Sequence, residues 1–447
     1  MQVLQPAAEI VAKVLKQQKP SDGTCYRPMT YCVVCDADEE TLVYNVLTKQ
    51  YISLTPSEAK AFSQPFVYVE KEATECVREL IAHRFLVPED HDDYTLCLQV
   101  RQLAKLLSAR KEKTKSYTIL TTTDCNARCF YCYELGRSRI TMTEQTAHEV
   151  ADYISAPKIA LQWFGGEPLY NRSAIDIICQ DLQSKGCDYS SEMVSNAYLF
   201  DEAMVEKATE LWHLKKVQVT LDGTEPVYNR CKAFLYKEGS AYRRVLRNVG
   251  LLLDAGIKVS IRLNIDMHNA EDLLLLVEEL KQRFADKNGL SVYSHIIFEE
   301  SLKHNRSEEE RKRLYAKQDL LDERISQLGL SPKKKLSTEI KVNHCKVDSG
   351  SSEIILPDGH IGLCEHYTED HFIGHISSKE QDQESIRQQR EIIDEEACHS
   401  CPVFPSCIRL RVCENNLVCY PEDRAKKIKN IQQTMMETRN HYFLASC

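Results

Sequence analysis

The uneven spacing of nineteen cysteines constrains this 447-residue chain more than any other feature. Three cysteines fall within residues 125–132, and seven fall within residues 345–419. A chain of this length is not a disulfide scaffold of the small secreted kind. Its N-terminus mixes charged and apolar residues and offers no secretory signal, so we expect a cytoplasmic protein. Clustered cysteines in that compartment indicate metal binding or catalysis.

Charge and hydropathy exclude two kinds of partner. The formal net charge of −9 argues against the broad basic surface that nucleic-acid binding requires. The longest aliphatic run, Leu273–Val277, is far shorter than the roughly 20 residues of a membrane-spanning helix. We therefore expect neither nucleic acid nor membrane as a partner.

Residues 111–335 alternate strand-like and helix-like patterns. One predicted helix, residues 241–255, carries an apolar stripe at helical spacing and is followed by Gly256, a typical C-terminal cap. Such repetition predicts an α/β fold with a parallel sheet and helical crossovers. Six units predict a partial (βα)6, TIM-like barrel, with strands at Tyr117–Thr122, Lys158–Phe164, Ser191–Ser195, Val217–Leu221, Lys258–Ile265 and Ser291–Phe298.

The two flanking parts differ from this middle part. Residues 1–110 predict strands at Thr30–Val34, Thr41–Val46 and Tyr51–Leu54 and helices from Ser57, at Ala73–Phe85 and at Leu96–Ala109. This order fits a small winged-helix-like module, which a basic stretch at residues 110–115 would link to the middle part. Residues 336–447 are turn-rich and dense in cysteine, so we expect cross-links, such as bound metal, to stabilise their fold.

The first cysteine cluster has the spacing C-x3-C-x2-C, at Cys125, Cys129 and Cys132. It directly follows the first predicted barrel strand, and active sites of barrels form at that end of the strands. Three thiolates can bind three corners of a [4Fe–4S] cluster, which normally takes four cysteines, and would leave one iron open. A zinc site is the alternative, but zinc prefers four ligands and no fourth Cys or His lies nearby in the sequence.

This motif, with the aromatic Tyr131 before its last cysteine, resembles the radical SAM superfamily. The resemblance implies that the open iron binds S-adenosylmethionine (SAM) through its amino and carboxylate groups. One electron from the reduced cluster would then cleave SAM to methionine and a 5′-deoxyadenosyl radical, which removes a hydrogen atom from the substrate. A reductase such as flavodoxin or ferredoxin would supply that electron.

Two further segments resemble motifs of the same superfamily in the expected order. Residues 164–168 read Phe-Gly-Gly-Glu-Pro and end the second predicted strand, as the GGEP motif does. Residues 195–197 read Ser-Asn-Ala, where relatives often have Thr-Asn-Gly. A carboxylate can accept hydrogen bonds from the SAM ammonium, and the polar pair could contact its ribose. The resemblance thus assigns to SAM binding Gly165, Gly166, Glu167, Ser195, Asn196 and Tyr131.

The fourth and fifth predicted strands add candidates of the same kind. The segment at Thr220 and Asp222 resembles the Ser-Leu-Asp-Gly motif, so Thr220 joins the SAM-binding candidates. Arg230, eight residues past Asp222, could pair with the SAM carboxylate or could be a surface arginine. Arg262 and Asn264, on one face of the fifth strand, are weaker candidates. No general base is assigned, because the carboxylates near strand ends are as readily turn or solvent carboxylates: Asp222, Asp266 and Glu299.

The C-terminal cysteines resemble the SPASM extension of these enzymes. The pattern is C-x13-G-x4-C from residue 345, then C-x2-C-x5-C-x5-C-x5-C from residue 398. The resemblance implies two auxiliary [4Fe–4S] clusters, one bound by Cys398, Cys401, Cys407 and Cys419 and one by Cys345, Cys364 and Cys413. The second would have an open iron for a substrate thiolate, or a fourth ligand from His344, His366 or Cys447. Two zinc knuckles would explain this array but not the barrel motifs.

Element order in residues 1–110 resembles the RiPP recognition element, a module that binds the leader of a precursor peptide as an added strand. Such capture raises the effective concentration of the peptide at the barrel. The sequence therefore predicts three domains, residues 1–110, 111–335 and 336–447, which require SAM and three [4Fe–4S] clusters.

The predicted function is modification of a ribosomally synthesised precursor peptide, with formation of a thioether between a cysteine sulfur and a carbon atom. Carbon–carbon crosslinking is one alternative. A second alternative is an anaerobic sulfatase maturase, which forms formylglycine. A non-enzymatic iron–sulfur or zinc protein is the alternative from a different class.

Overall fold

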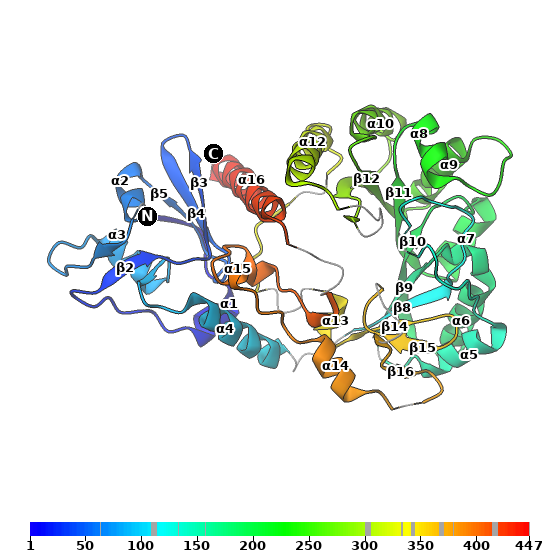
Figure 1. Cartoon of the computed structure of the whole chain (residues 1–447), viewed down its shortest axis with the longest axis horizontal. Helices are drawn as coiled ribbons and strands as arrows, with labels where there is room; N and C mark the ends of the chain where they lie inside the picture. The colour runs from blue at the N-terminus through cyan, green and yellow to red at the C-terminus, as the bar shows by residue number, and fades with distance from the viewer. Residues whose placement is uncertain are drawn as a thin grey trace. The chain divides into compact units, whose positions relative to one another are not determined.

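The computed structural model describes residues 1–62, 64–108, 114–132, 134–156, 158–299, 305–331, 334–340, 345–365, 371–378, 380–413 and 419–446. The chain divides into two compact units (Figure 1). Unit 1 comprises Met1–Glu112, Lys333–Ser349 and Glu391–Cys447, and unit 2 comprises Lys113–Pro332 and Gly350–Arg390. Residues 336–447, which we expected to form one domain, are thus shared between the two units, and the three predicted boundaries stay predictions.

Unit 2 contains a sheet in which six neighbouring strands, counted from one edge, are parallel and follow one another in chain order. This confirms the predicted α/β fold with a parallel sheet. The last strand ends at Ile296 rather than at Phe298. The six strands are β8 (Lys115–Thr122), β9 (Lys158–Gly165), β10 (Asp188–Ser195), β11 (Leu214–Leu221), β12 (Lys258–Ile265) and β13 (Leu290–Ile296).

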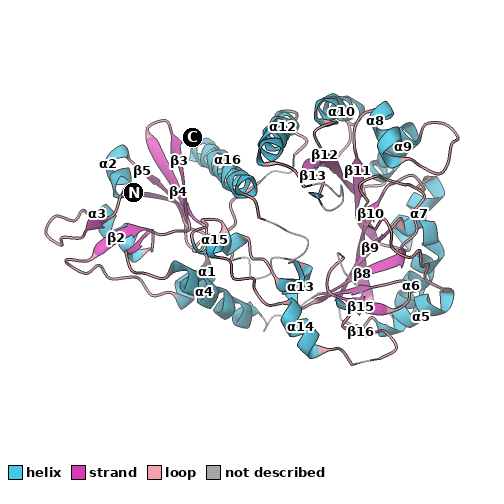
Figure 2. Cartoon of the chain, viewed as in Figure 1, coloured by secondary structure: helices cyan, strands magenta, loops and turns pink. Residues whose placement is uncertain are grey.

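Amphipathic helices connect these strands and cover the sheet (Figure 2). The apolar stripe of α9 is buried as predicted, including Val245, Val249 and Leu252, and Gly256 follows with a φ of 77°. Side-chain caps begin several helices, for example Ser240 before α9. The helices are α5 (Glu144–Tyr153), α6 (Arg172–Ser184), α7 (Glu202–Glu210), α8 (Glu225–Lys232), α9 (Ala241–Asp254), α10 (Ala270–Arg283) and α12 (Glu308–Gln327).

Three short strands from the C-terminal part extend this sheet, which the sequence did not predict. β14 (Ser352–Ile355) pairs parallel to β8, and β15 (His360–Gly362) returns antiparallel to β14. β16 (Gly374–His375) then pairs with β15. The segment around Cys364 therefore belongs to unit 2, together with α14 (Gln383–Gln389).

Unit 1 contains two small antiparallel sheets. The first has the order β1-β5-β4-β3, and its strands are β1 (Gln2–Gln5), β3 (Cys32–Ala37), β4 (Glu40–Asn45) and β5 (Tyr51–Leu54). Three of these match the predicted meander, whereas β1 was not predicted. The second sheet, β6-β2-β7, was also missed; it comprises β2 (Cys25–Pro28), β6 (Phe66–Val67) and β7 (Leu86–Pro88).

Helices complete unit 1. The predicted second and third helices correspond to α3 (Glu75–Ala82) and α4 (Asp93–Ser108), and the first is only the short α2 (Pro56–Ala59). α16 (Pro421–Ser446) contacts the edge strand β3, where Gln432 Nε2 donates to the carbonyl of Val34 at 2.8 Å. The remaining helices are α1 (Glu9–Val14), α13 (Lys346–Ser349) and α15 (Glu396–His399). In the described part of the chain, no helix combines the length and apolar character needed to cross a membrane.

Candidate active site

A pocket of about 550 Å³ opens at the carboxyl ends of the parallel strands of unit 2. Its wall is built from the loop after β8, the ends of β9, β10 and β11, and residues of β12. Carboxyl ends of parallel strands are where α/β folds build their active sites, because the connecting loops converge there. Its volume lies within the usual range for small-molecule sites.

The three-cysteine loop forms one side of this pocket, and Cys125, Cys129 and Cys132 all line it. Burial raises the pKa of Cys125 to about 12, and the nearby Glu167, Cys129 and Cys132 add to this shift. Three half-buried thiols that repel one another as anions need a bound cation to become thiolates together, and this donor set fits an iron–sulfur cluster. Among the described residues, no group of three or more His, Cys, Asp or Glu side chains is arranged to hold a single metal ion.

Two glycines allow the end of β9 to approach the cysteine loop. Gly165 has a φ of 120°, and a Cβ atom there would lie 2.2 Å from the Thr122 carbonyl oxygen. A Cβ atom at Gly166 would lie 2.2 Å from the carbonyl oxygen of Asp124. The same carbonyl of Asp124 accepts a hydrogen bond from the Glu167 amide at 3.0 Å. Glycine is therefore required at both positions by backbone packing.

Glu167 is fully buried and binds the neighbouring loop after β10. Its carboxylate accepts hydrogen bonds from Ser195 Oγ and from the Asn196 amide, each at 2.8 Å. Burial raises the pKa of Glu167 to about 7, although these hydrogen bonds act in the opposite direction. In this structure the predicted SAM-binding carboxylate holds together two other predicted residues, and both of those line the pocket.

Asn196 and two residues of β11 and β12 present polar groups to the pocket. Asn196 Nδ2 donates to Asn126 Oδ1 at 2.7 Å, beside Cys125. Thr220 and Asn264 also line the pocket, and the buried Asn264 Oδ1 accepts no hydrogen bond from the described residues. An acceptor left in this state suits a ligand that donates a hydrogen bond. Arg262, also in the wall, contacts His295 Nδ1 through Nη2 at 2.9 Å.

Tyr131, Asp222 and Lys232 form a buried cluster beneath the cysteine loop. The Tyr131 hydroxyl donates to Asp222 Oδ1 at 2.6 Å, and Lys232 Nζ donates to the Tyr131 hydroxyl at 2.9 Å. Lys232 Nζ also pairs with Asp222 Oδ2 at 3.2 Å. Glycine fits at the next position, Gly223, because a Cβ atom there would lie 2.3 Å from Asp272 Oδ2.

Lys232 was not predicted, whereas Arg230 was predicted either to pair with the SAM carboxylate or to be a surface arginine. Arg230 is exposed on α8, outside the pocket wall, as a surface arginine would be. Residues two apart on a helix point to different sides. Lys232 shares its face with the fully buried Tyr228 four residues earlier. That spacing is the signal that could have identified it.

Charged residues of the cysteine loop were also missed. Arg128, Arg137 and Arg139 line the pocket together with Glu134. Burial raises the pKa of Glu134 to about 7, while Arg137 acts in the opposite direction. The arginines give this part of the wall a positive charge that suits an anionic group such as a carboxylate.

The other carboxylates near strand ends have structural roles in the described chain. Asp266 Oδ1 accepts hydrogen bonds from the amides of His268 and Asn269, at 2.7 and 3.1 Å, and so closes a turn. Glu299 accepts from the Arg306 amide at 3.2 Å. Neither arrangement identifies a general base.

The C-terminal cysteines fall into groups. Burial raises the pKa of Cys398 to about 11, with contributions from Glu395 and then from Cys401, Cys419 and Cys407, so these four thiols lie near one another in unit 1. Cys413 interacts electrostatically with Cys345 in the same unit, whereas Cys364 belongs to unit 2. The alternative fourth ligands, His344, His366 and Cys447, lie outside the described residues.

Comparison with known proteins agrees with this site. Residues 119–280 match the family "Radical SAM superfamily". Fe-coproporphyrin III synthase of Methanosarcina barkeri is 24% identical over 197 residues, which span 43% of this chain and 47% of that protein. The chain thus matches about half the length of this curated relative.

A solved structure with a TM-score above 0.5 agrees with this fold. Native anSMEcpe with bound AdoMet and Cp18Cys peptide has a TM-score of 0.52 at 15% identity and covers 73% of this chain and 99% of that chain. SuiB of Streptococcus suis bound to precursor peptide SuiA has a TM-score of 0.49 at 12% identity and covers 86% and 94%. The matched residues 119–280 contain the cysteine loop that lines the pocket, so this part of the chain is similar to the radical SAM superfamily.

Proposed function

We propose that this radical SAM enzyme modifies a ribosomally synthesised precursor peptide by joining a cysteine sulfur to a carbon atom. The convergence of Cys125, Cys129 and Cys132 with the ends of the parallel strands in one pocket carries the proposal. In this proposal the three thiolates bind a [4Fe–4S] cluster with one open iron. The reduced cluster and SAM together supply a radical that abstracts hydrogen.

The chain's own residues bind and orient SAM in this proposal. Thr220, Ser195 and Asn196 contact its polar groups from the ends of β10 and β11, while Gly165 and Gly166 let the backbone approach it. Glu167 fixes the loop of Ser195 and Asn196 through the two hydrogen bonds at 2.8 Å. Because Arg230 is exposed, the pocket arginines are better placed than Arg230 to attract the SAM carboxylate.

Two auxiliary [4Fe–4S] clusters complete the proposed enzyme. The mutual proximity of Cys398, Cys401, Cys407 and Cys419 supports one four-cysteine cluster. The second would use Cys345, Cys364 and Cys413 and would leave an iron open for the substrate thiolate. Thioether formation removes two hydrogens from the peptide: the radical takes one as an atom, and the other leaves as a proton and an electron that an auxiliary cluster accepts. Because this chemistry needs reduced thiols and a flavodoxin or ferredoxin donor, we propose that the protein works in the cytoplasm.

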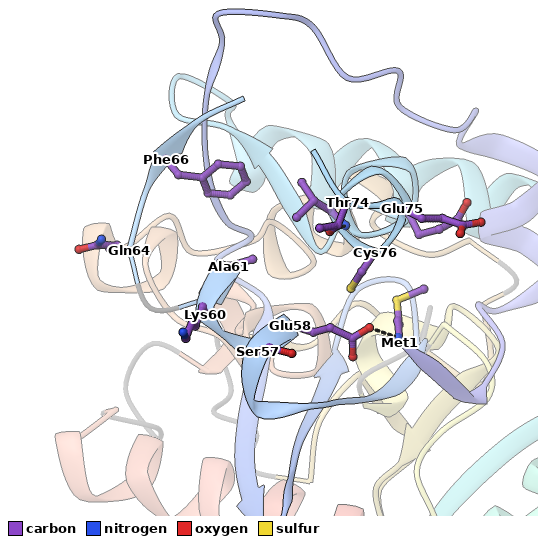
Figure 3. A pocket seen from close by; sticks show the side chains of 12 residues that line it. Met1, Ser57, Glu58, Lys60, Ala61, Gln64, Phe66, Thr74, Glu75 and Cys76 are labelled. Atoms are coloured by element: carbon purple, nitrogen blue, oxygen red, sulfur yellow. Dashed lines mark hydrogen bonds and ion pairs between the residues drawn. The ribbon is translucent and has the colours of Figure 1, made fainter. Parts of the chain in front are cut away.

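Unit 1 is the proposed site of leader-peptide capture. β1 and β3 are the edge strands of its first described sheet, and α16 contacts β3, so a leader strand would add along β1. A pocket of about 850 Å³ lies beside it, with side chains from α2, α3 and β6 (Figure 3). Glu58 pairs with the Met1 ammonium (Figure 3). Glu75 and Glu79 also line this pocket, near Phe66, which suits a peptide with basic and apolar side chains. The fold similarity to anSMEcpe, solved with a peptide, also supports a peptide substrate.

Co-expression with a short cysteine-containing precursor from a neighbouring reading frame tests the reaction. We expect a product that has lost two hydrogens, resists thiol alkylation at one cysteine, and shows a sulfur–carbon link in tandem mass spectra. A product in which every cysteine still alkylates rules out the thioether and, if it has lost two hydrogens, favours a carbon–carbon link.

Formylglycine formation is the second candidate, favoured by the fold similarity to anSMEcpe with its Cp18Cys peptide. The same mass spectra separate it, because a cysteine oxidised to formylglycine loses its sulfur. Metal analysis separates the non-enzymatic alternative: we expect about twelve irons per chain with matching sulfide. Zinc without sulfide would instead indicate a structural metal protein.

A further inference from the structure

Lys232, the last residue of α8, carries a buried positive charge to the cysteine loop. Its side chain is 5% exposed, and its partner Asp222 is 1% exposed. Lysine is almost never buried without a partner, because removing its charge from water is costly. Here its ammonium joins the Tyr131 hydroxyl, at 2.9 Å, to the Asp222 carboxylate, at 3.2 Å.

The backbone around Lys232 holds the same loop a second time. The Arg128 amide donates to the carbonyl of Lys232 at 2.9 Å. Ala233 then adopts a left-handed conformation, with φ 44° and ψ 57°, and the Leu235 amide donates to the carbonyl of Asn126 at 2.9 Å. Asn126 and Arg128, which lie just before Cys129, are therefore both hydrogen-bonded to the end of α8 and the residues after it.

Lys232 also lines the same pocket as Cys129. The Asp222 carboxylate at 3.2 Å balances the charge of the buried Lys232 ammonium. A fixed positive charge thus lies beside one of the proposed cluster ligands.

We propose that Lys232 is a positioning residue that fixes the cysteine loop through Tyr131 and Asp222 and makes the cluster easier to reduce. Reduction adds an electron to the cluster, and a nearby positive charge in a buried site stabilises the added negative charge. The inference rests on Cys125, Cys129 and Cys132 being the cluster ligands. It does not depend on which peptide is the substrate.

A potentiometric titration followed by electron paramagnetic resonance tests this role in anaerobically reconstituted protein. Lys232→Met should shift the midpoint potential of the SAM-binding cluster to a more negative value, and Lys232→Arg should restore most of the wild-type value. Lys207→Met is the control, because it removes a lysine that is also paired with an aspartate. Lys207 on α7 pairs with Asp176 on α6 at 2.8 Å, and neither residue lines the pocket. It should leave the midpoint potential unchanged.

A double variant keeps the test decisive where Lys232→Met fails to fold. Asp222→Asn combined with Lys232→Met leaves no unpaired buried charge, so it should recover the thermal midpoint. Its midpoint potential should lie between those of wild type and Lys232→Met, or below wild type if the single variant yields no protein. A potential equal to that of wild type in Lys232→Met, or in the double variant when it alone folds, overturns the proposal. A wild-type protein without the cluster signal overturns the proposed function instead.

Discussion

At the residue scale, the backbone of the pocket decides which side chains its loops accept. Gly165 adopts a φ of 120°, and Gly166 leaves no room for a Cβ atom. Ala197 adopts a φ of 59°, a conformation that costs an L-residue about 1–2 kcal/mol. The Thr-Asn-Gly motif that residues 195–197 resemble has glycine at this position, and glycine adopts the left-handed conformation readily. The sequence therefore indicates the motif, but the contacts that require glycine at residues 165 and 166 depend on how two loops pack together.

Gly166→Ala tests the close approach of β9 to the cysteine loop. The added Cβ atom would meet the Asp124 carbonyl oxygen, so the loop must move and Cys125 with it. We expect iron per chain after reconstitution to fall by roughly the four irons of one cluster. Gly362→Ala is the control, because nothing lies within 4 Å of a Cβ atom there. Full iron content in Gly166→Ala would contradict the account of this contact.

The raised pKa of Glu167 predicts a pH dependence of stability. Its folded-state pKa is about 7 and its ordinary value is 4.5, so the folded chain holds a proton that the unfolded chain releases between these values. Stability should therefore fall as the pH rises from 4.5 to 7, by up to about 3 kcal/mol from this group. Thermal unfolding of cluster-free protein across this range measures the loss. Glu167→Gln should flatten the curve, and an equally steep fall in that variant would contradict the assignment.

Residue spacing alone could not distinguish Lys232 from Arg230. The motif spacing made Arg230 a candidate, but the direction of α8 against the sheet determines which cation is buried. That direction follows from Tyr228, whose ring is fully buried on the same helix face as Lys232. The cysteines and glycines of the pocket wall were predictable from their motifs, because few other residues can replace them. The sequence does not show whether a single lysine or arginine side chain points into the protein or into solvent.

At the element scale, predictions succeeded where a strand is long enough to show its period. β12 spans eight residues that alternate polar and apolar, and its apolar side chains are buried. β14 was missed because four residues give little pattern and its partner, β8, lies more than two hundred residues earlier. β1 and the β6-β2-β7 sheet were missed for the same reason, since short strands are defined by their partners.

Helix α9 supports the site through one side chain. Asn248 is fully buried, and its Nδ2 donates to the carbonyls of Ala197 and Tyr198 at 2.9 and 3.2 Å. Asn248→Leu would leave both carbonyls without these donors, at a cost of about 1–3 kcal/mol. Because the loop also carries Ser195 and Asn196, we expect weaker SAM binding by isothermal calorimetry as well as a lower thermal midpoint. Leu252→Met on the same helix should bind SAM normally; equal SAM affinity in both variants would remove α9 from the site.

At the scale of the whole molecule, the pocket of the three-cysteine loop and most of the proposed auxiliary cysteines belong to different structural units. Unit 2 holds the pocket and Cys364, and unit 1 holds the four thiols grouped around Cys398. From the sequence we predicted three consecutive domains. The contacts instead join the N-terminal segment with C-terminal segments in unit 1. Such pairing of distant segments carries no local signal in the sequence.

The central claim is that the three-cysteine pocket cleaves SAM. Production of 5′-deoxyadenosine by anaerobically reconstituted protein, with SAM and dithionite, measures this directly. We predict that wild type produces it, and that a variant with Cys125, Cys129 and Cys132 replaced by Ala produces none while retaining about eight irons per chain. Continued formation of 5′-deoxyadenosine by that variant would contradict the account.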